Sequence, residues 1–144
     1  MGVGEAVTVP IDAKGGTVAI RGRQWAQSGV DAAVDFPPTA LATATDITLI
    51  ETAIPPPHDL LDWSPVYRVE PLGLALAAPA PLRLPWSNLS GSVPSLSIWF
   101  SPDGHCFTRV PDSYTNAGFE QGSATQLGYF IVAAQRSAAT ASCP

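Results

Sequence analysis

Proline residues occur along the whole chain and restrict the folds that it can adopt. The 144 residues include 15 prolines, spread from Pro10 to Pro144. Because each proline lacks an amide donor and clashes with the preceding helical turn, few windows are long enough for an ordinary helix. Apolar residues nevertheless make up 46% of the sequence, which is typical of a folded chain. The sequence therefore excludes an all-helical architecture.

Short segments with alternating apolar and polar residues recur along the chain, which is typical of strands with one buried face. The clearest are Ile47–Glu51 and Val66–Glu70. Other segments of this kind cover residues 7–9, 17–20, 33–36, 74–76, 82–84, 96–100, 106–110 and 129–132. Turn signals separate these short segments, and no helical pattern lies between them, apart from a possible short helical turn at residues 39–45.

This pattern predicts an all-β fold, a two-sheet antiparallel β-sandwich with long loops. One domain is expected to cover residues 1–135, followed by a flexible tail at residues 136–144. Trp99 alternates with apolar neighbours and is predicted to lie in the core. The other predicted members of this single core are Val34, Phe36, Ile47, Leu49, Val66, Val69, Leu82, Leu84, Ile98, Phe107, Tyr129 and Ile131.

Two predicted loops, Arg21–Asp31 and Ile54–Ser64, are longer than a connection between strands requires. Excess loop length on a rigid sandwich is where binding residues are commonly found. A tryptophan in such a loop can anchor a partner, or it can fold back over an open end of the sandwich. Both interpretations stay open for Trp25, Trp63 and Trp86. The candidate binding residues of the two loops are Arg23, Trp25, His58, Asp59, Asp62 and Trp63.

Three side chains of the second loop, those of His58, Asp59 and Asp62, could in principle form a metal or acid site. No other segment supplies the second half of such a site, and the sequence contains no CxxC or HxxxH spacing. A solvated polar loop is the favoured interpretation. We therefore expect no metal ion and no cofactor.

The two cysteines, Cys106 and Cys143, are candidates for a disulfide bond. Cys106 follows an Asp103-Gly104 turn signal and is predicted to lie in a strand, whereas Cys143 lies in the predicted tail. A bond between them would close a long loop and stabilise the fold by roughly 4 kcal/mol. Alternatively, Cys106 behaves as a small apolar residue and Cys143 stays free.

The charge and the apolar runs restrict the possible partners. The net charge of −5 leaves no basic patch for a phosphate backbone, so nucleic acid is not an expected partner. No apolar run approaches the ~20 residues that a membrane helix needs, so we expect no membrane insertion. The first residues show no basic region followed by an apolar stretch. An extracellular or cell-surface location is expected if a signal peptide was removed, and otherwise a cytoplasmic one.

Four blocks of the sequence, in order, resemble one known family. The blocks are Gly15–Val18, Val34–Leu49 with its Pro-Pro turn, Ser64–Leu74, and Ala78–Pro85. Together they are similar to the ZU5 domain, the β-sandwich module of ankyrins, netrin receptors, death-domain proteins and many bacterial surface proteins. The resemblance covers roughly residues 13–134. One departure is Thr39, which stands where the family usually has glycine.

Some members of this family cleave themselves at a His-Phe-Ser motif near the last strand. The matching stretch here is Thr125–Phe130, in which Gln126 stands in place of the histidine and Gly128 in place of the serine. Both the base and the nucleophile of that reaction are therefore missing. We expect no self-cleavage, and no other catalytic constellation is evident in the sequence.

The resemblance implies a non-enzymatic module for protein–protein interaction or assembly, which docks to another protein or to a second copy of itself. The high alanine and proline content, with arginine in place of lysine, fits a bacterial source with GC-rich DNA. The alternative function is a carbohydrate-binding sandwich, in which Trp25, Trp63 or Trp86 would stack on sugar rings.

Overall fold

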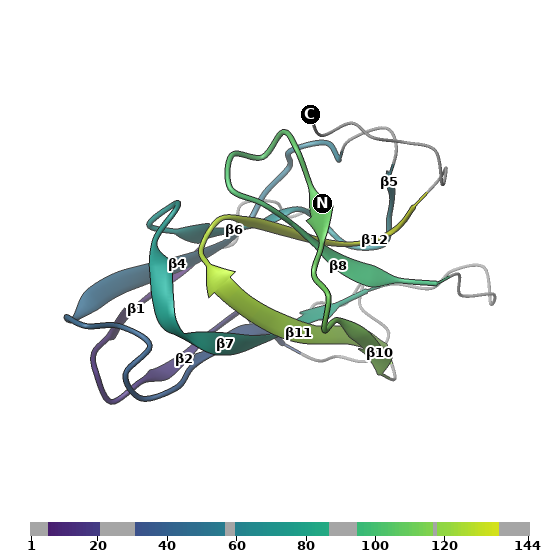
Figure 1. The fold of residues 1–144 in the computed structure, drawn as a ribbon. Coiled ribbons are helices and arrows are strands. Elements are labelled where there is room, and N and C mark those ends of the chain that lie inside the picture. The colour runs from purple at the N-terminus through teal and green to yellow at the C-terminus, as the bar shows by residue number, and fades with distance from the viewer. Residues whose placement is uncertain (1–5, 21–30, 57–59, 87–94, 117, 136–144) are drawn as a thin grey trace.

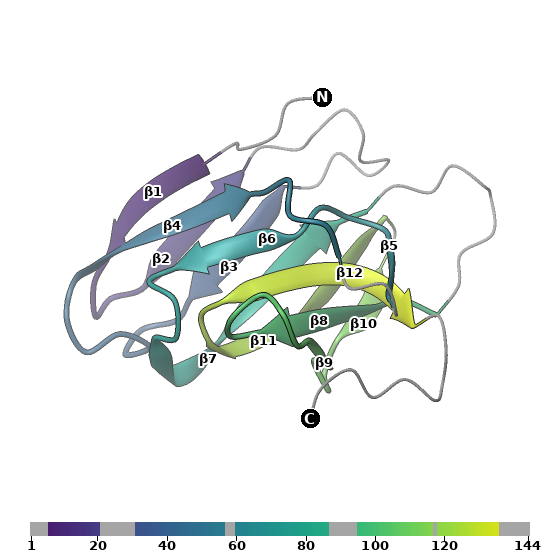
Figure 2. The same ribbon diagram turned by 90° about the horizontal axis from the view of Figure 1, so that it is seen from above.

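The computed structural model describes residues 6–20, 31–56, 60–86, 95–116 and 118–135. It confirms the predicted all-β, two-sheet antiparallel β-sandwich (Figures 1 and 2). In Figure 1, strands β6, β12 and β8 of one sheet lie above β7 and β11 of the other. The predicted tail at residues 136–144 lies outside the described residues.

The first sheet has the strand order β1-β4-β6-β12-β8-β9, and β5 pairs with the end of β12. The strands of this sheet are β1 (Ala6–Ile11), β4 (Thr45–Glu51), β5 (Leu60–Asp62), β6 (Tyr67–Glu70), β8 (Ser97–Ser101), β9 (Thr108–Arg109) and β12 (Tyr129–Gln135). The second sheet has the order β10-β11-β7-β3-β2. Its strands are β2 (Gly16–Ile20), β3 (Ala32–Phe36), β7 (Ala75–Pro85), β10 (Tyr114–Asn116) and β11 (Phe119–Gln126).

Several predicted strands differ in extent from the observed ones. The two predicted strands at residues 74–76 and 82–84 belong to the single long strand β7. The predicted strand at residues 106–110 was too long, because only Thr108–Arg109 pairs with β8. Strands β5, β10 and β11 were not predicted. The described part of residues 39–45 forms turns and bends rather than a helical turn.

The main core lies between the sheets, and most of the predicted core residues contribute to it. Alternate residues of β4 and β7 point inward, which the alternating burial of these strands shows. Buried members of this cluster include Val34, Phe36, Ile47, Leu49, Val69, Leu82, Leu84 and Ile98. Ala40 and Leu41, which follow the Pro37-Pro38 turn, are also buried in it.

A second apolar cluster covers part of the outer face of the first sheet, so the prediction of one core was wrong. Phe130 and Val132 of β12 point into the main core, whereas Tyr129 and Ile131 belong to the second cluster. Val66 and Phe107 are also buried there, and half-buried Trp99 packs against it. Because every residue of β12 from Tyr129 to Ala134 is buried, the strand has no solvent-facing side.

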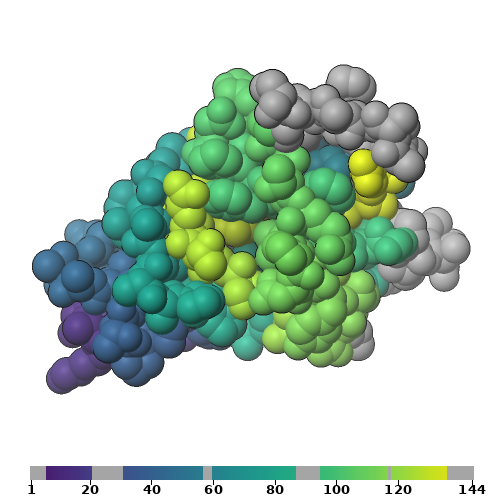
Figure 3. All heavy atoms as spheres, viewed as in Figure 1, coloured from purple at the N-terminus to yellow at the C-terminus, as the bar shows by residue number. Residues whose placement is uncertain are grey.

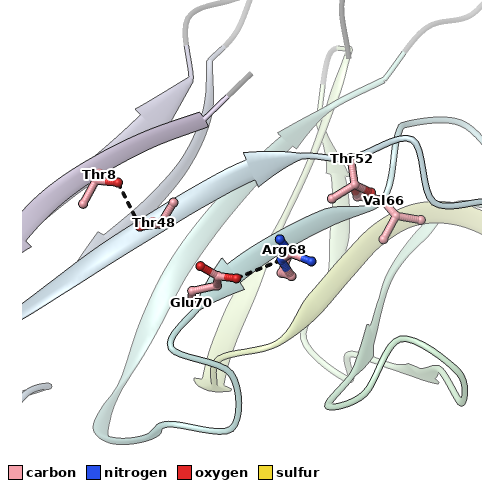
Figure 4. A network of polar contacts seen from close by, with 6 residues as sticks. All are labelled: Thr8, Thr48, Thr52, Val66, Arg68 and Glu70. Carbon is pink, nitrogen blue, oxygen red and sulfur yellow. Dashed lines mark hydrogen bonds and ion pairs between the residues drawn. The ribbon is translucent and has the colours of Figure 1, made fainter. Parts of the chain in front are cut away.

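The outer face of the same sheet carries polar side chains on β1, β4 and β6, as Figure 4 shows. The hydroxyl oxygens of Thr8 on β1 and Thr48 on β4 lie 2.9 Å apart. On β6, Arg68 Nε lies 3.1 Å from Glu70 Oε2. The segment that leaves β4 is held by a hydrogen bond from Thr52 Oγ1 to the Val66 carbonyl oxygen, 2.7 Å long. Only the part of this face near β12 therefore needs an apolar cover.

Gly128, between β11 and β12, is required by a close approach of two strands. A Cβ atom built at this position would lie 2.6 Å from the Ser101 carbonyl oxygen and 2.9 Å from a ring carbon of Phe100. The carbonyl belongs to β8, which is paired with β12 and cannot shift alone. In the self-cleavage motif a serine nucleophile stands at the position of Gly128. Glycine removes that nucleophile, and glycine is also the residue that the close packing permits here.

We predict that Gly128→Ala lowers the free energy of unfolding by about 1–3 kcal/mol, because the added methyl group overpacks this junction. Chemical denaturation monitored by tryptophan fluorescence measures the change. Gly122→Ala is the matched control, since the nearest atoms there lie at 3.3–3.4 Å. Equal stability of the two variants would contradict the packing argument.

Candidate functional site

Both long loops start and end at the same end of the sandwich. In the second sheet, Ile20 pairs with Ala32, so residues 21–31 connect two adjacent strand ends. In the first sheet, Glu51 pairs with Tyr67, which places both ends of the Thr52–Val66 connection there. A third long connection runs between the strand ends at Pro85 and Ser97. Pro85 pairs with Phe119 and Ser97 pairs with Ala133, and both strand ends lie at this end too. We call this the loop end of the sandwich.

Trp63 and Trp86 join the two sheets at the loop end. Their ring centroids are 5.7 Å apart and the ring planes are inclined by 82°, an edge-to-face pair. Trp86 is buried in the main core, and half-buried Trp63 packs against that core. The backbone N–H of Trp63 also donates to the Val132 carbonyl oxygen at 2.8 Å. Both rings therefore cover the end of the core, and only part of Trp63 faces outward.

The other sequence-predicted binding residues are only partly described. Asp62 lies on β5, is exposed, and pairs through its backbone with Ala133 of β12. Arg23, Trp25, His58 and Asp59 lie outside the described residues. Among the residues that the structure describes, no group of three or more His, Cys, Asp or Glu side chains could hold a metal ion. The described part of the chain also contains no helix that could cross a membrane.

Glu120 is a buried carboxylate that the sequence analysis missed. It lies on β11, is 0% exposed, and belongs to the inward-facing side of the strand together with Gly122 and Ala124. Thr115 Oγ1 donates a hydrogen bond to Glu120 Oε2 at 3.2 Å, while Oε1 has no hydrogen-bond partner among the described residues. Burial raises the pKa of Glu120 to about 6, although the Thr115 hydrogen bond and the positive charge of Arg109 act in the opposite direction.

One signal in the sequence indicated that Glu120, Gly122 and Ala124 share the inward side of a strand, namely their spacing of two residues. It was not recognised because a carboxylate and two small residues do not resemble the inward face of a strand. Two other buried polar atoms, Trp86 Nε1 and Ser113 Oγ, likewise have no hydrogen-bond partner within the described residues. Burial of Trp86 agrees with one of the two interpretations left open for it, the cover over an end of the sandwich, whereas burial of Ser113 was not predicted.

The loop between β8 and β9 is organised by Asp103. Its Oδ1 accepts hydrogen bonds from the backbone N–H of His105 and the hydroxyl of Ser101, each at 2.9 Å. The His105 hydrogen bond is the main reason that the pKa of Asp103 is lowered. Cys106 lies in this loop and not in a strand, so that part of the prediction was wrong. Cys106 is disulfide-bonded, and Cys143, the other cysteine of the sequence, lies outside the described residues.

Comparisons with known proteins identify no relative: no protein-family model matches the chain, and no curated protein does. The resemblance to the ZU5 domain therefore stays a prediction that rests on the four sequence blocks.

We predict that protonation of Glu120 stabilises the fold. In the unfolded chain the pKa is near the ordinary value of 4.5, whereas in the folded chain it is about 6, so the folded state binds the proton more tightly. The free energy of unfolding should therefore rise as the pH falls through this window, by about 2 kcal/mol from this group. Denaturant titrations across these pH values measure the rise.

Glu120→Gln should remove this pH-dependent part of the free energy of unfolding. At pH values above the pKa of Glu120 in the folded chain, the variant should be more stable, because no charge is buried at this position. Glu70→Gln is the control, since Glu70 lies on the outer face of the sheet. A pH profile that is unchanged by Glu120→Gln would contradict the assignment.

We predict a disulfide bond between Cys106 and Cys143 in the purified, unreduced protein. Trypsin cleavage after Arg83, Arg109 and Arg136 should then yield one linked product of residues 84–109 and 137–144. Reduction should separate these peptides and lower the stability of the intact chain by roughly 4 kcal/mol. Intact mass spectrometry shows whether the chain cuts itself between Leu127 and Gly128. We expect no such cut.

Proposed function

We propose that the protein is a non-enzymatic interaction module whose loop end docks to another protein or to a second copy of itself. The observation that carries this proposal is the placement of the strand ends that bound both long loops at one end of the sandwich. A rigid sandwich with several connections at one end is a common arrangement for recognition. The ZU5-like sequence blocks support the same class of function.

The contact between Trp63 and Trp86 limits which tryptophans could bind a sugar in the alternative, carbohydrate-binding function. A sugar ring stacks on the open face of an aromatic ring. Trp86 is only 4% exposed, so its ring cannot serve as such a platform. Trp63 is half-buried against the core. Carbohydrate binding therefore stays an alternative that depends mainly on Trp25.

The disulfide-bonded state of Cys106 bears on the location of the protein. Disulfide bonds persist in oxidising compartments and are rare in the cytosol. This favours an extracellular or cell-surface location over a cytoplasmic one. A bacterial surface module is the form of the proposal that agrees with the composition.

The experiment first identifies which class of partner binds. Light scattering against protein concentration tests for a second copy, a glycan array tests for carbohydrate, and selection from a displayed peptide library tests for protein partners. We expect self-association or a selected peptide, and no glycan. A glycan that binds with saturation while the other two assays stay negative would replace the proposal by the carbohydrate alternative.

Two tryptophan variants then test the loop end with the binder found. Trp25→Ala is expected to weaken binding by roughly thirtyfold, the effect of losing an interface anchor, without a change in the melting temperature. Trp63→Ala is expected to lower the melting temperature by several degrees, because it removes a ring that packs on Trp86. Leu72→Ala is the control, since Leu72 is 46% exposed between β6 and β7, at the opposite end. Normal binding by Trp25→Ala and Trp63→Ala would exclude the loop end.

A further inference from the structure

A pocket of about 420 Å³ lies at one open edge of the sandwich, between residues 108–112 on one side and residues 123–126 of β11 on the other. The rings of Phe100 and Phe130 form its floor, with centroids 5.0 Å apart, and both residues belong to the main core between the sheets. In Figure 3 the pocket lies on the face turned to the viewer, where the green atoms around residues 100–112 meet the yellow-green atoms of β11. Its volume is in the range of ligand sites.

One edge of β11 has no strand beside it at this pocket. Strand β10 pairs with β11 at residues 119–121, and β7 occupies the other edge of β11. Strand β10 does not extend farther along β11, because residues 110–113 form a turn in which Ser113 N–H donates to the Val110 carbonyl oxygen at 3.1 Å. Within the described residues, the β10 side of residues 123–126 therefore faces no neighbouring strand. An edge of this kind can pair with an added strand.

Asp112 places a carboxylate where the two walls of the pocket meet. Its Oδ1 accepts a hydrogen bond from the backbone N–H of Ser123 at 3.1 Å, and both residues line the pocket. No cationic side chain of the described residues forms an ion pair with Asp112. The other charged residue of the lining, Arg109, is paired with Trp99, so its side chain lies on the outer face of the first sheet. A ligand in the pocket would therefore meet a negative charge.

We propose that this edge binds an extended peptide segment of another protein. The segment pairs with the free edge of β11, places an apolar side chain on the floor of Phe100 and Phe130, and places a lysine or arginine beside Asp112. Added strands bind through their backbone, an aromatic floor buries an apolar group, and an unpaired carboxylate attracts a cation. The site contains no residue of the loop end, so it is a second interaction surface and independent of the first.

Amide chemical shifts of the isotope-labelled protein test the proposal with capped pentapeptides. The first probe is acetyl-Lys-Thr-Phe-Thr-Lys-amide, whose symmetric sequence suits either strand direction. We expect saturable shifts at Phe100, Ala124 and Thr125, with a Kd of about 1 mM or lower. No saturation at about 10 mM peptide would overturn the proposal. Shifts confined to the surroundings of Trp63 and Trp86 would also overturn it, and would assign the binding to the loop end.

Charge is tested with an acidic counterpart of this probe and with one matched pair of variants. Acetyl-Glu-Thr-Phe-Thr-Glu-amide should bind roughly tenfold more weakly than the lysine peptide. Asp112→Asn keeps an oxygen that can accept the Ser123 N–H, but it removes the charge, so most of this preference should be lost. Asp46→Asn, on β4 near the opposite edge of the first sheet, changes the net charge equally and should keep the preference. A preference that survives Asp112→Asn would overturn the role of Asp112.

Three further probes test the backbone and the apolar side chain. Acetyl-Lys-Pro-Phe-Pro-Lys-amide lacks the N–H donors next to the phenylalanine, and acetyl-Lys-Thr-Ala-Thr-Lys-amide lacks the ring. Both should bind at least roughly tenfold more weakly than the first probe. Undiminished binding of the proline peptide would overturn the pairing with β11, and undiminished binding of the alanine peptide would overturn the role of the floor. The third probe, 3-phenylpropylamine, has the ring and the cation without a peptide backbone. If it binds as tightly as the first probe, the site is one for small amines and the peptide proposal is wrong.

Discussion

Burial of both faces of β12 is the constraint on which the rest of the fold depends. Its backbone pairs with β6, β8 and β5, and its side chains alternate between the main core and the outer cluster. A strand of this kind cannot lie at a solvent-facing position of an antiparallel sheet without an additional cover. The segment before β6 supplies Leu60 and Val66 for that cover, and the loop after β8 supplies Phe107.

This cover also shapes the loop end. The chain from Glu51 to Tyr67 is longer than a hairpin needs because it forms β5, which pairs with the end of β12, and supplies Leu60 and Val66 to the outer cluster. The end of β5 then places Trp63 beside Trp86, where it closes the main core. Part of the excess length that the sequence analysis assigned to recognition therefore has a structural cause. Residues 21–30, which include Trp25, lie outside the described residues, so their part in binding stays a prediction.

Alternation along the sequence predicted β2, β4 and β6 because each of these strands has one buried side. The same rule failed for β12, where residues 129–134 contain no charged or amide side chain, so periodicity could not tell which face Tyr129 and Ile131 occupy. It also failed for β11, whose inward side holds the polar residue Glu120. The predicted loop Ile54–Ser64 contains the unpredicted strand β5, on which Asp62 lies. Contacts such as the one between Trp63 and Trp86 join distant positions and leave no local pattern, so the sequence could not predict them.

The inward side of β11 carries smaller apolar side chains than the inward sides of β3 and β4. Where β3 and β4 contribute Val34, Phe36 and Leu49 to the core, β11 contributes a carboxylate and two small residues. A Cβ atom at Gly122 would lie 3.4 Å from Cγ1 of Val110, which also lines the pocket at this edge. Burial of the Glu120 carboxylate raises its pKa, and the positive charge of Arg109 offsets only part of that effect.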